Sequence, residues 1–213
     1  MRTRIKICGV MRPEDGVLVA EAGADAIGLV FYERSPRYVS PERANEIIEA
    51  LPPLVTAVGL FMDAAPDKVK DILGQVPLDL LQFHGAESAA DCERHGRRYI
   101  KAVGMAGGDP WDVAKRHPQA HALLLDGHAP GAAGGSGQAF NWSQALPSSH
   151  RIIIAGGLGA GNVAEAIRQT HPWGVDCSSA VESSPGVKNG RKVAAFCEEV
   201  HRVERHTGHR FTG

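Results

Sequence analysis

Eight short apolar runs, each followed by a stretch of helical character, recur along this chain at intervals of about 20 to 30 residues. The runs lack strict alternation of polar and apolar residues, which is typical of strands buried on both faces of a parallel sheet. Eight strand–helix units of this length predict an α/β protein with a single-domain (β/α)8 barrel, the TIM barrel. The expected strand ends are Cys8, Val30, Phe61, Phe83, Val103, Asp126, Ala155 and Cys177.

The same pattern predicts the bounds of the elements. Strands are expected over residues 4–8, 26–30, 55–61, 78–83, 99–104, 122–126, 151–157 and 174–179. Helices are expected over residues 13–23, 41–51, 66–73, 84–94, 110–117, 162–169 and 191–205, several of them beginning at proline. The barrel domain is expected to span residues 1–213, with a frayed tail from about residue 207.

Composition excludes several classes of function. The formal net charge is −1 and no basic stripe is present, so no nucleic-acid partner is expected. No run of about 18 apolar residues and no apolar signal core occur, so neither a membrane partner nor secretion is expected. Four cysteines without a CxxC pair fit free thiols in a reducing cytoplasm. No residues show metal-ligand spacing and no GxGxxG motif follows a strand, so no metal or nicotinamide cofactor is expected.

In barrels of this kind the catalytic residues follow the carboxyl ends of the strands. Cys8 ends the first strand; it is either a small core residue or, if its pKa is lowered, a thiolate that takes a proton or attacks carbon. Asp126 ends the sixth strand after four apolar residues. It is either a loop cap or Arg partner, or a general acid whose pKa is raised by partial desolvation.

The seventh and eighth strand ends are the usual place for phosphate in this fold. Gly156 and Gly157 follow strand seven, and Ser178 and Ser179 follow strand eight; bare amides and hydroxyls suit a phosphate dianion. The Gly-rich stretch 127–137 after strand six is better placed as an active-site loop than as a linker.

Two further side chains are candidates for substrate contact. Arg37, after strand two, is either a surface residue or forks onto a carboxylate of the ligand. His84, after strand four, is either a structural histidine or part of the binding site. Additional candidates near strand ends are Met62, Asp63, Gln82 and Lys101.

Seven blocks of this chain, in order and at every strand end from about Arg4 to His206, resemble phosphoribosylanthranilate isomerase: KICG, GLVFYERSPRYVS, LQFHG, LLLD, GGSGQAFNW, IAGGL and DCSSAVESSPGVKN. The resemblance implies a cofactor-free Amadori rearrangement of N-(5-phosphoribosyl)anthranilate in tryptophan biosynthesis, in a monomer or homodimer. It implies that Cys8 is the base, Asp126 the acid and Arg37 the contact for the anthranilate part. It also implies that phosphate lies on the loops carrying Gly156, Gly157, Ser178 and Ser179.

Three positions depart from the family's pattern. Asn141 and Asn189 stand where the family usually has aspartate, which is expected to alter loop hydrogen bonds. Ala180 stands where it usually has glycine, and its methyl group is expected to crowd the phosphate unless φ is negative and the side chain points outward.

Three alternatives remain at this point. A related sugar-phosphate isomerase of histidine synthesis needs aspartates after strands one and five, where this chain has Cys8 and the pair Val103-Gly104. A cysteine hydrolase needs a histidine at Cys8, for which His84 is the candidate. A non-catalytic phosphosugar-binding barrel needs the phosphate loops but not Cys8 and Asp126 together.

Overall fold

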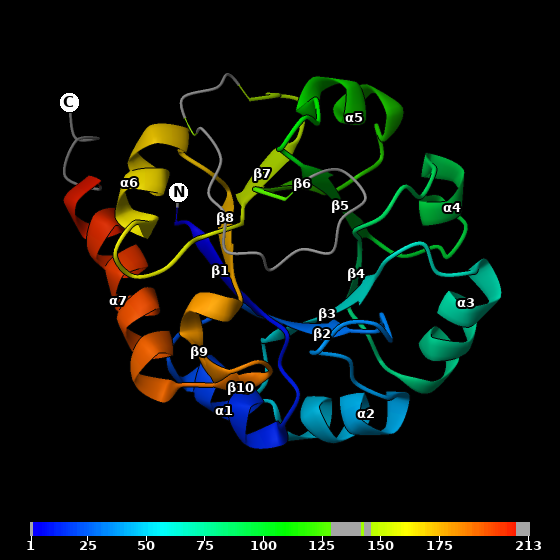
Figure 1. The fold of residues 1–213 in the computed structure, drawn as a ribbon, viewed down its shortest axis with the longest axis horizontal. Helices are drawn as coiled ribbons and strands as arrows, with labels where there is room; N and C mark the ends of the chain where they lie inside the picture. The colour runs from blue at the N-terminus through cyan, green and yellow to red at the C-terminus, as the bar shows by residue number, and fades with distance from the viewer. Residues whose placement is uncertain (1, 129–141, 143–145, 208–213) are drawn as a thin grey trace.

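Eight parallel strands close into a ring in chain order, with β8 pairing back onto β1 (Figure 1). The structure is a computed structural model and describes residues 2–128, 142 and 146–207. The predicted (β/α)8 fold is therefore confirmed. Its strands are β1 (Arg4–Cys8), β2 (Ala26–Val30), β3 (Thr56–Phe61), β4 (Leu80–Phe83), β5 (Tyr99–Gly104), β6 (Ala122–Asp126), β7 (Arg151–Ile154) and β8 (Gly174–Cys177).

Helices surround this ring on the outside in Figure 1. They are α1 (Pro13–Glu21), α2 (Pro41–Ala50), α3 (Pro66–Gln75), α4 (Ala89–Glu93), α5 (Pro110–Arg116), α6 (Val163–Thr170) and α7 (Gly190–Thr207). Four of them begin at proline, whose fixed φ suits the first helical position and whose missing N–H is not needed there. Between β6 and β7 the described residues form no helix. None of the described helices combines the length and apolar composition needed to cross a membrane.

The segment after β8 forms structure that the sequence pattern did not predict. A 3-10 turn, η1 (Ser179–Val181), leads into an antiparallel hairpin of β9 (Glu182–Ser184) and β10 (Val187–Lys188). Gly186 turns this hairpin at φ +80°, and a Cβ there would stand 2.1 Å from the Met11 sulfur. The hairpin therefore packs against the loop that follows β1.

β7 ends at Ile154 and β8 at Cys177, close to the expected strand ends Ala155 and Cys177. The longer sequence ranges 151–157 and 174–179 also take in the first residues of the following loops. Gly156 and Gly157 adopt φ of +76° and +66°, which is left-handed backbone that cannot continue a strand. The apolar run thus ends where the chain must turn across the mouth of the barrel.

Successive side chains of β1 point alternately to the core under the helices and to the barrel interior. Ile5 and Ile7 belong to the apolar core shared with the helices, whereas Lys6 and Cys8 project to the barrel interior. Lys6 Nζ lies 3.1 Å from both carboxylate oxygens of Asp176, its register partner on β8. Both side chains are buried, so each charge depends on the other for compensation. This Lys6–Asp176 pair lies on the same face of β1 as Cys8.

Candidate active site

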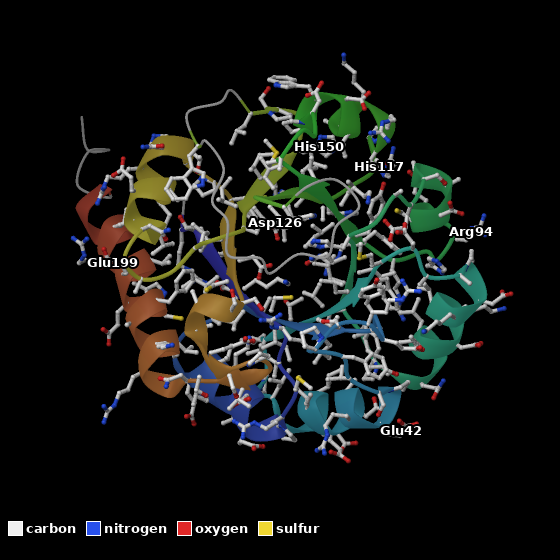
Figure 2. All side chains as sticks on the ribbon, viewed as in Figure 1. Glu42, Arg94, His117, Asp126, His150 and Glu199 are labelled. Atoms are coloured by element: carbon white, nitrogen blue, oxygen red, sulfur yellow. The ribbon has the colours of Figure 1, made fainter. Side chains whose placement is uncertain are left out.

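All the predicted site residues that the structure describes lie at the carboxyl ends of strands, and therefore at one mouth of the barrel. Cys8 and Asp126 are the last residues of β1 and β6, and His84 follows β4. In Figure 2 the labelled Asp126 lies within the ring of strands, whereas Glu42, Arg94 and Glu199 lie at its periphery. A cavity of about 460 Å³ opens instead at the amino ends of the strands, the mouth where this fold carries residues for stability.

Cys8 is held by both its backbone and its surroundings. Its carbonyl oxygen accepts hydrogen bonds from Ser178 Oγ at 3.0 Å and from Lys188 Nζ at 2.6 Å. A Cβ on Gly28 would stand 2.6 Å from the Cys8 sulfur and 3.1 Å from Lys6 Nζ. Glycine at this position therefore leaves room for the thiol and the ammonium to lie next to each other.

Burial raises the pKa of the Cys8 thiol, and the neighbouring ammonium groups of Lys6 and Lys188 only partly oppose that rise. The net pKa is above the ordinary value of a thiol. A thiolate at this position would need a lowered pKa, and the surroundings of Cys8 do not lower it.

The pKa of Asp126 shifts in the opposite direction, below its ordinary value. Burial alone raises the pKa of its carboxyl, but contact with His128 and the proximity of His84 outweigh this effect and lower it. Asp126 Oδ1 lies 3.1 Å from His128 Nδ1 and accepts a long hydrogen bond of 3.4 Å from the His128 backbone N–H. The pKa of Asp126 is thus lowered rather than raised, because two histidines that the sequence pattern does not bring together lie next to this carboxylate. At neutral pH the directions put a proton on Cys8 and leave Asp126 ionised.

His84 belongs to this cluster. Its ring stacks on the His128 ring with centroids 4.7 Å apart, and its Nδ1 lies 3.2 Å from Gln82 Nε2. Burial and the neighbouring His128 lower the pKa of His84 to about 3, so the ring is neutral. No contact between His84 and Cys8 occurs among the described interactions, so this structure offers no support for a cysteine hydrolase. His128 was missed by the sequence analysis, although an Asp-x-His sequence at a strand end is a usable signal.

Arg37 is placed differently from the expectation. Its Nε and Nη2 donate to the two carboxylate oxygens of Glu182 at 2.9 and 2.8 Å. In this structure the two nitrogens Nε and Nη2 are thus engaged by the protein's own Glu182, and contact of Arg37 with a ligand stays a prediction. The side chain passes over Gly9, where a Cβ would stand 2.4 Å from Arg37 Cδ and φ is +75°.

Glu182 is shared by two cations. Besides Arg37 it accepts from Lys188 Nζ at 2.8 Å, and the Lys188 side chain is fully buried. Burial raises the pKa of Glu182, but Arg37 and Lys188 outweigh it and lower the pKa, so the carboxylate stays ionised. Because Lys188 also holds the Cys8 carbonyl, this network ties the β9–β10 hairpin to the candidate base. Neither Glu182 nor Lys188 was singled out from the sequence.

The loop after β7 is built to present backbone N–H groups. Gly156 and Gly157 are consecutive left-handed residues, and such turns form concave sites for anions. Asn162 fixes the loop: its Oδ1 accepts from Gly159 N at 2.9 Å and its Nδ2 donates to Gly157 O at 2.8 Å. After the neighbouring strand β8, Ser178 Oγ already donates to Cys8 O, so Ser178 can offer a phosphate its backbone N–H rather than its hydroxyl proton. Ser179 opens η1.

The three residues that depart from the family's pattern lie in different surroundings. Asn141 lies outside the described residues, as do residues 129–137 of the Gly-rich stretch. Asn189 caps α7: its Oδ1 accepts from Lys192 N at 3.2 Å, a task that asparagine performs as well as aspartate. Ala180 lies in η1, is exposed, and is not among the described non-glycine residues with positive φ. Its methyl group faces Gly159, where a Cβ would stand 3.3 Å away.

Changing Ala180→Gly is expected to leave KM and kcat nearly unaltered. Negative φ needs no glycine, and the methyl group lies against the β7 loop. The change should cost about 0.5–1 kcal/mol of stability, because glycine has more freedom to lose on folding. Saturation curves for the two proteins at one pH and salt concentration test this, and a clear fall in KM would show that the methyl group does crowd the phosphate.

Changing Asn189→Ala is expected to lower the free energy of unfolding by about 1 kcal/mol, since the Lys192 N–H then loses its cap. Asn189→Asp is the matched control and should keep the stability of the unchanged protein. Urea denaturation of the three proteins measures both effects. Equal stability of the alanine and aspartate variants would remove the capping role.

A closed parallel barrel that buries a thiol and a carboxylate at one mouth, beside a left-handed glycine pair, defines an enzyme of the acid–base class. The family model described as N-(5'phosphoribosyl)anthranilate (PRA) isomerase matches residues 5–199. N-(5'-phosphoribosyl)anthranilate isomerase of Nitrosococcus oceani is 50% identical over 206 residues, which cover 95% of this chain and 100% of that protein. The protein of the same name from Azotobacter vinelandii is 51% identical and covers 94% and 98%.

Solved structures agree. Phosphoribosyl anthranilate isomerase from Thermotoga maritima superposes with a TM-score of 0.85 at 38% identity, covering 94% of this chain and 99% of that one. A phosphoribosyl anthranilate isomerase in complex with reduced 1-(o-carboxyphenylamino)-1-deoxyribulose 5-phosphate gives a TM-score of 0.80 at 35% identity, covering 94% and 99%. This chain belongs to the N-(5'-phosphoribosyl)anthranilate isomerase family, and the predicted isomerase is confirmed.

Proposed function

We propose that this barrel converts N-(5-phosphoribosyl)anthranilate to 1-(2-carboxyphenylamino)-1-deoxyribulose 5-phosphate in tryptophan biosynthesis, with Asp126 as acid and Cys8 as base. The observation that carries the proposal is the placement of one buried thiol and one buried carboxylate at the ends of β1 and β6 in a barrel of this family. An acid and a base approaching from different strands are what the reaction needs.

The chemistry assigns a proton to each group. The acid delivers a proton to the furanose oxygen as the C1–O bond opens. The anthranilate nitrogen attached to C1 then forms an iminium ion with C1. The base removes the proton from C2, and the resulting enolamine becomes the ketone. Because the iminium accepts the electrons itself, we expect no metal or cofactor to be required.

The reactive form of the enzyme has its proton on Asp126 and a thiolate at Cys8. The pKa directions favour the reverse distribution, with the proton on Cys8. The two forms differ by the transfer of one proton and have the same net charge. Lys6 and Lys188 oppose the rise in the pKa of Cys8, so they lower the cost of forming the thiolate.

Substrate binding is assigned to the remaining predicted residues. Backbone N–H groups around Gly156, Gly157, Ser178 and Ser179 bind the phosphate, supported by the left-handed geometry of the glycine pair. Arg37 uses Nη1, the guanidinium nitrogen outside its fork with Glu182, toward the anthranilate carboxylate. His84 lines the site beside Asp126.

A fluorescence assay with freshly prepared phosphoribosylanthranilate tests the function directly. The anthranilate signal is expected to disappear faster with enzyme than by spontaneous decay, and dialysis against a chelator should not slow it. The matched control is the Cys8→Ala/Asp126→Asn protein, which should be close to the spontaneous rate. Turnover of the aminoimidazole carboxamide intermediate of histidine synthesis instead would favour the alternative isomerase, and binding without turnover would favour the phosphosugar-binding barrel.

We also propose a cytoplasmic, single-domain enzyme that is a monomer or homodimer. A relative from Thermotoga maritima is described as dimeric, which supports testing for a dimer here. Light scattering on a sizing column distinguishes the two states.

A further inference from the structure

Three buried side chains from two strand ends converge at the mouth of the barrel. His84 follows β4, while Asp126 and His128 lie at the end of β6. One ligand atom from each residue lies within 4.8 Å of the other two. The sequence itself shows no metal-ligand spacing, because the fold has to bring the ends of β4 and β6 together before these three residues become neighbours.

Two nitrogens in this cluster are left unused. His84 Nε2 and His128 Nδ1 are buried and have no hydrogen-bond partner among the described residues. His128 Nδ1 lies 3.1 Å from Asp126 Oδ1, yet the contact lacks the alignment of a hydrogen bond. A buried polar group without a partner is costly, and both of these nitrogens belong to residues of the three-residue cluster, so a ligand bound there would compensate them.

Gln82 can prepare His84 for a ligand. Its Nε2 lies 3.2 Å from His84 Nδ1, while its Oε1 is buried and has no partner among the described residues. Turning the amide over brings Oε1 to the ring, where it accepts a proton held on Nδ1 and leaves a lone pair on Nε2. Metal-binding histidines are oriented by an outer acceptor of this kind.

We propose that His84, Asp126 and His128 form a binding site for a transition-metal dication, with Zn²⁺ as the ion whose donor preference and geometry fit best. Two imidazole nitrogens and one carboxylate oxygen are a common zinc set and leave a fourth position open.

The nearby cations do not prevent this. Lys6 and Lys101 both lie close enough to act on His84, but each is held by a carboxylate. Lys6 pairs with Asp176 at 3.1 Å, and Lys101 Nζ pairs with Glu87 Oε2 at 2.9 Å. The site therefore faces two neutralised pairs and one ionised carboxylate of its own.

Occupancy of this site should inhibit the isomerase, which rests on the proposed role of Asp126. A carboxylate that coordinates Zn²⁺ has its lone pair engaged and cannot carry the proton for ring opening. Zinc is thus expected to act as an inhibitor, and a chelator should restore the rate.

Calorimetric titration of the whole protein with ZnCl₂ tests the site without reference to activity. The unchanged protein should bind one ion here. His128→Phe keeps a ring stacked on His84 but removes the nitrogen, and should weaken binding by at least about 10- to 100-fold, the loss that even an outer partner causes. Gln82→Leu removes that outer partner and should weaken binding by about 10- to 100-fold. His121→Gln, an exposed histidine at the opposite mouth, is the matched control and should bind as the unchanged protein does.

The outcomes separate the site from the enzyme mechanism. Unchanged zinc affinity in both His128→Phe and Gln82→Leu, or no zinc uptake by the unchanged protein, overturns the site. If His128→Phe does not fold, Gln82→Leu decides alone. Binding that is lost in the variants, but that leaves the isomerase rate of the unchanged protein intact at full occupancy, establishes the site and instead removes Asp126 as the acid.

Discussion

Replacing Cys8→Ser is expected to lower kcat by about a hundredfold or more, the scale of a lost acid–base group. Serine keeps the size of the side chain, but its hydroxyl ionises only far above working pH. Burial raises the pKa even of the Cys8 thiol, and Lys6 and Lys188 oppose that rise, so in the proposed mechanism these two ammonium groups lower the cost of forming the thiolate. Lys6 and Lys188 would also stabilise the anion of a serine hydroxyl in the same position, but the hydroxyl would still be almost fully protonated at working pH.

Single-turnover and steady-state assays of Cys8→Ser measure this loss. Affinity for reduced 1-(o-carboxyphenylamino)-1-deoxyribulose 5-phosphate should change little, which shows that the site is intact. Cys177→Ser is the matched control: this thiol is also buried, its Sγ donates to Leu158 O at 3.1 Å, and a serine can make the same bond. Near-normal turnover in Cys8→Ser would reduce Cys8 to a core residue.

Replacing Asp126→Asn is expected to lower kcat by about 10²–10⁴-fold, because the amide has nearly the same shape but cannot deliver an acidic proton to the furanose oxygen. The amide can still accept the 3.4 Å hydrogen bond from the His128 backbone, so the strand end should keep its conformation. Ring opening should then limit the rate, and binding of the reduced product should be largely retained.

Rapid-quench analysis shows which step has slowed in Asp126→Asn. Asp112→Asn, an exposed carboxylate on α5 that pairs with Arg116 at 2.8 Å, is a charge-matched control and should keep the rate. Turnover of Asp126→Asn equal to that of the unchanged protein would assign proton delivery to another group.

The local pattern of apolar runs in the sequence was enough to predict the ring of strands, but it did not predict the side-chain contacts at the mouth of the barrel. β1, β2, β5 and β6 have the predicted bounds, because each is an apolar run closed by a charge, glycine or turn. The sequence ranges 151–157 and 174–179 reach past the ends of β7 and β8, because residue type alone does not show the exact residue at which the backbone turns.

The strand pattern places Cys8 and Asp126 at strand ends, but it does not contain partners that come from distant segments. The catalytic roles of both residues stay predictions. The fork between Arg37 and Glu182 joins residues 145 positions apart, and no local pattern contains it. The directions of the pKa shifts are not contained in the sequence pattern for the same reason, because they depend on neighbours such as His128 and on the depth of burial around Cys8.

Closure of the ring makes the mouth of this barrel depend on both ends of the chain. The carbonyl of Cys8 is held by Ser178 and Lys188, which are synthesised 170 and 180 residues later. Until β8 is in place, β1 and β7 present open edges that can pair with other chains, and closure removes both. A catalytically competent molecule is therefore one whose two sheet edges have already been joined, so recovered activity after refolding measures the fraction of chains that avoided aggregation at those edges.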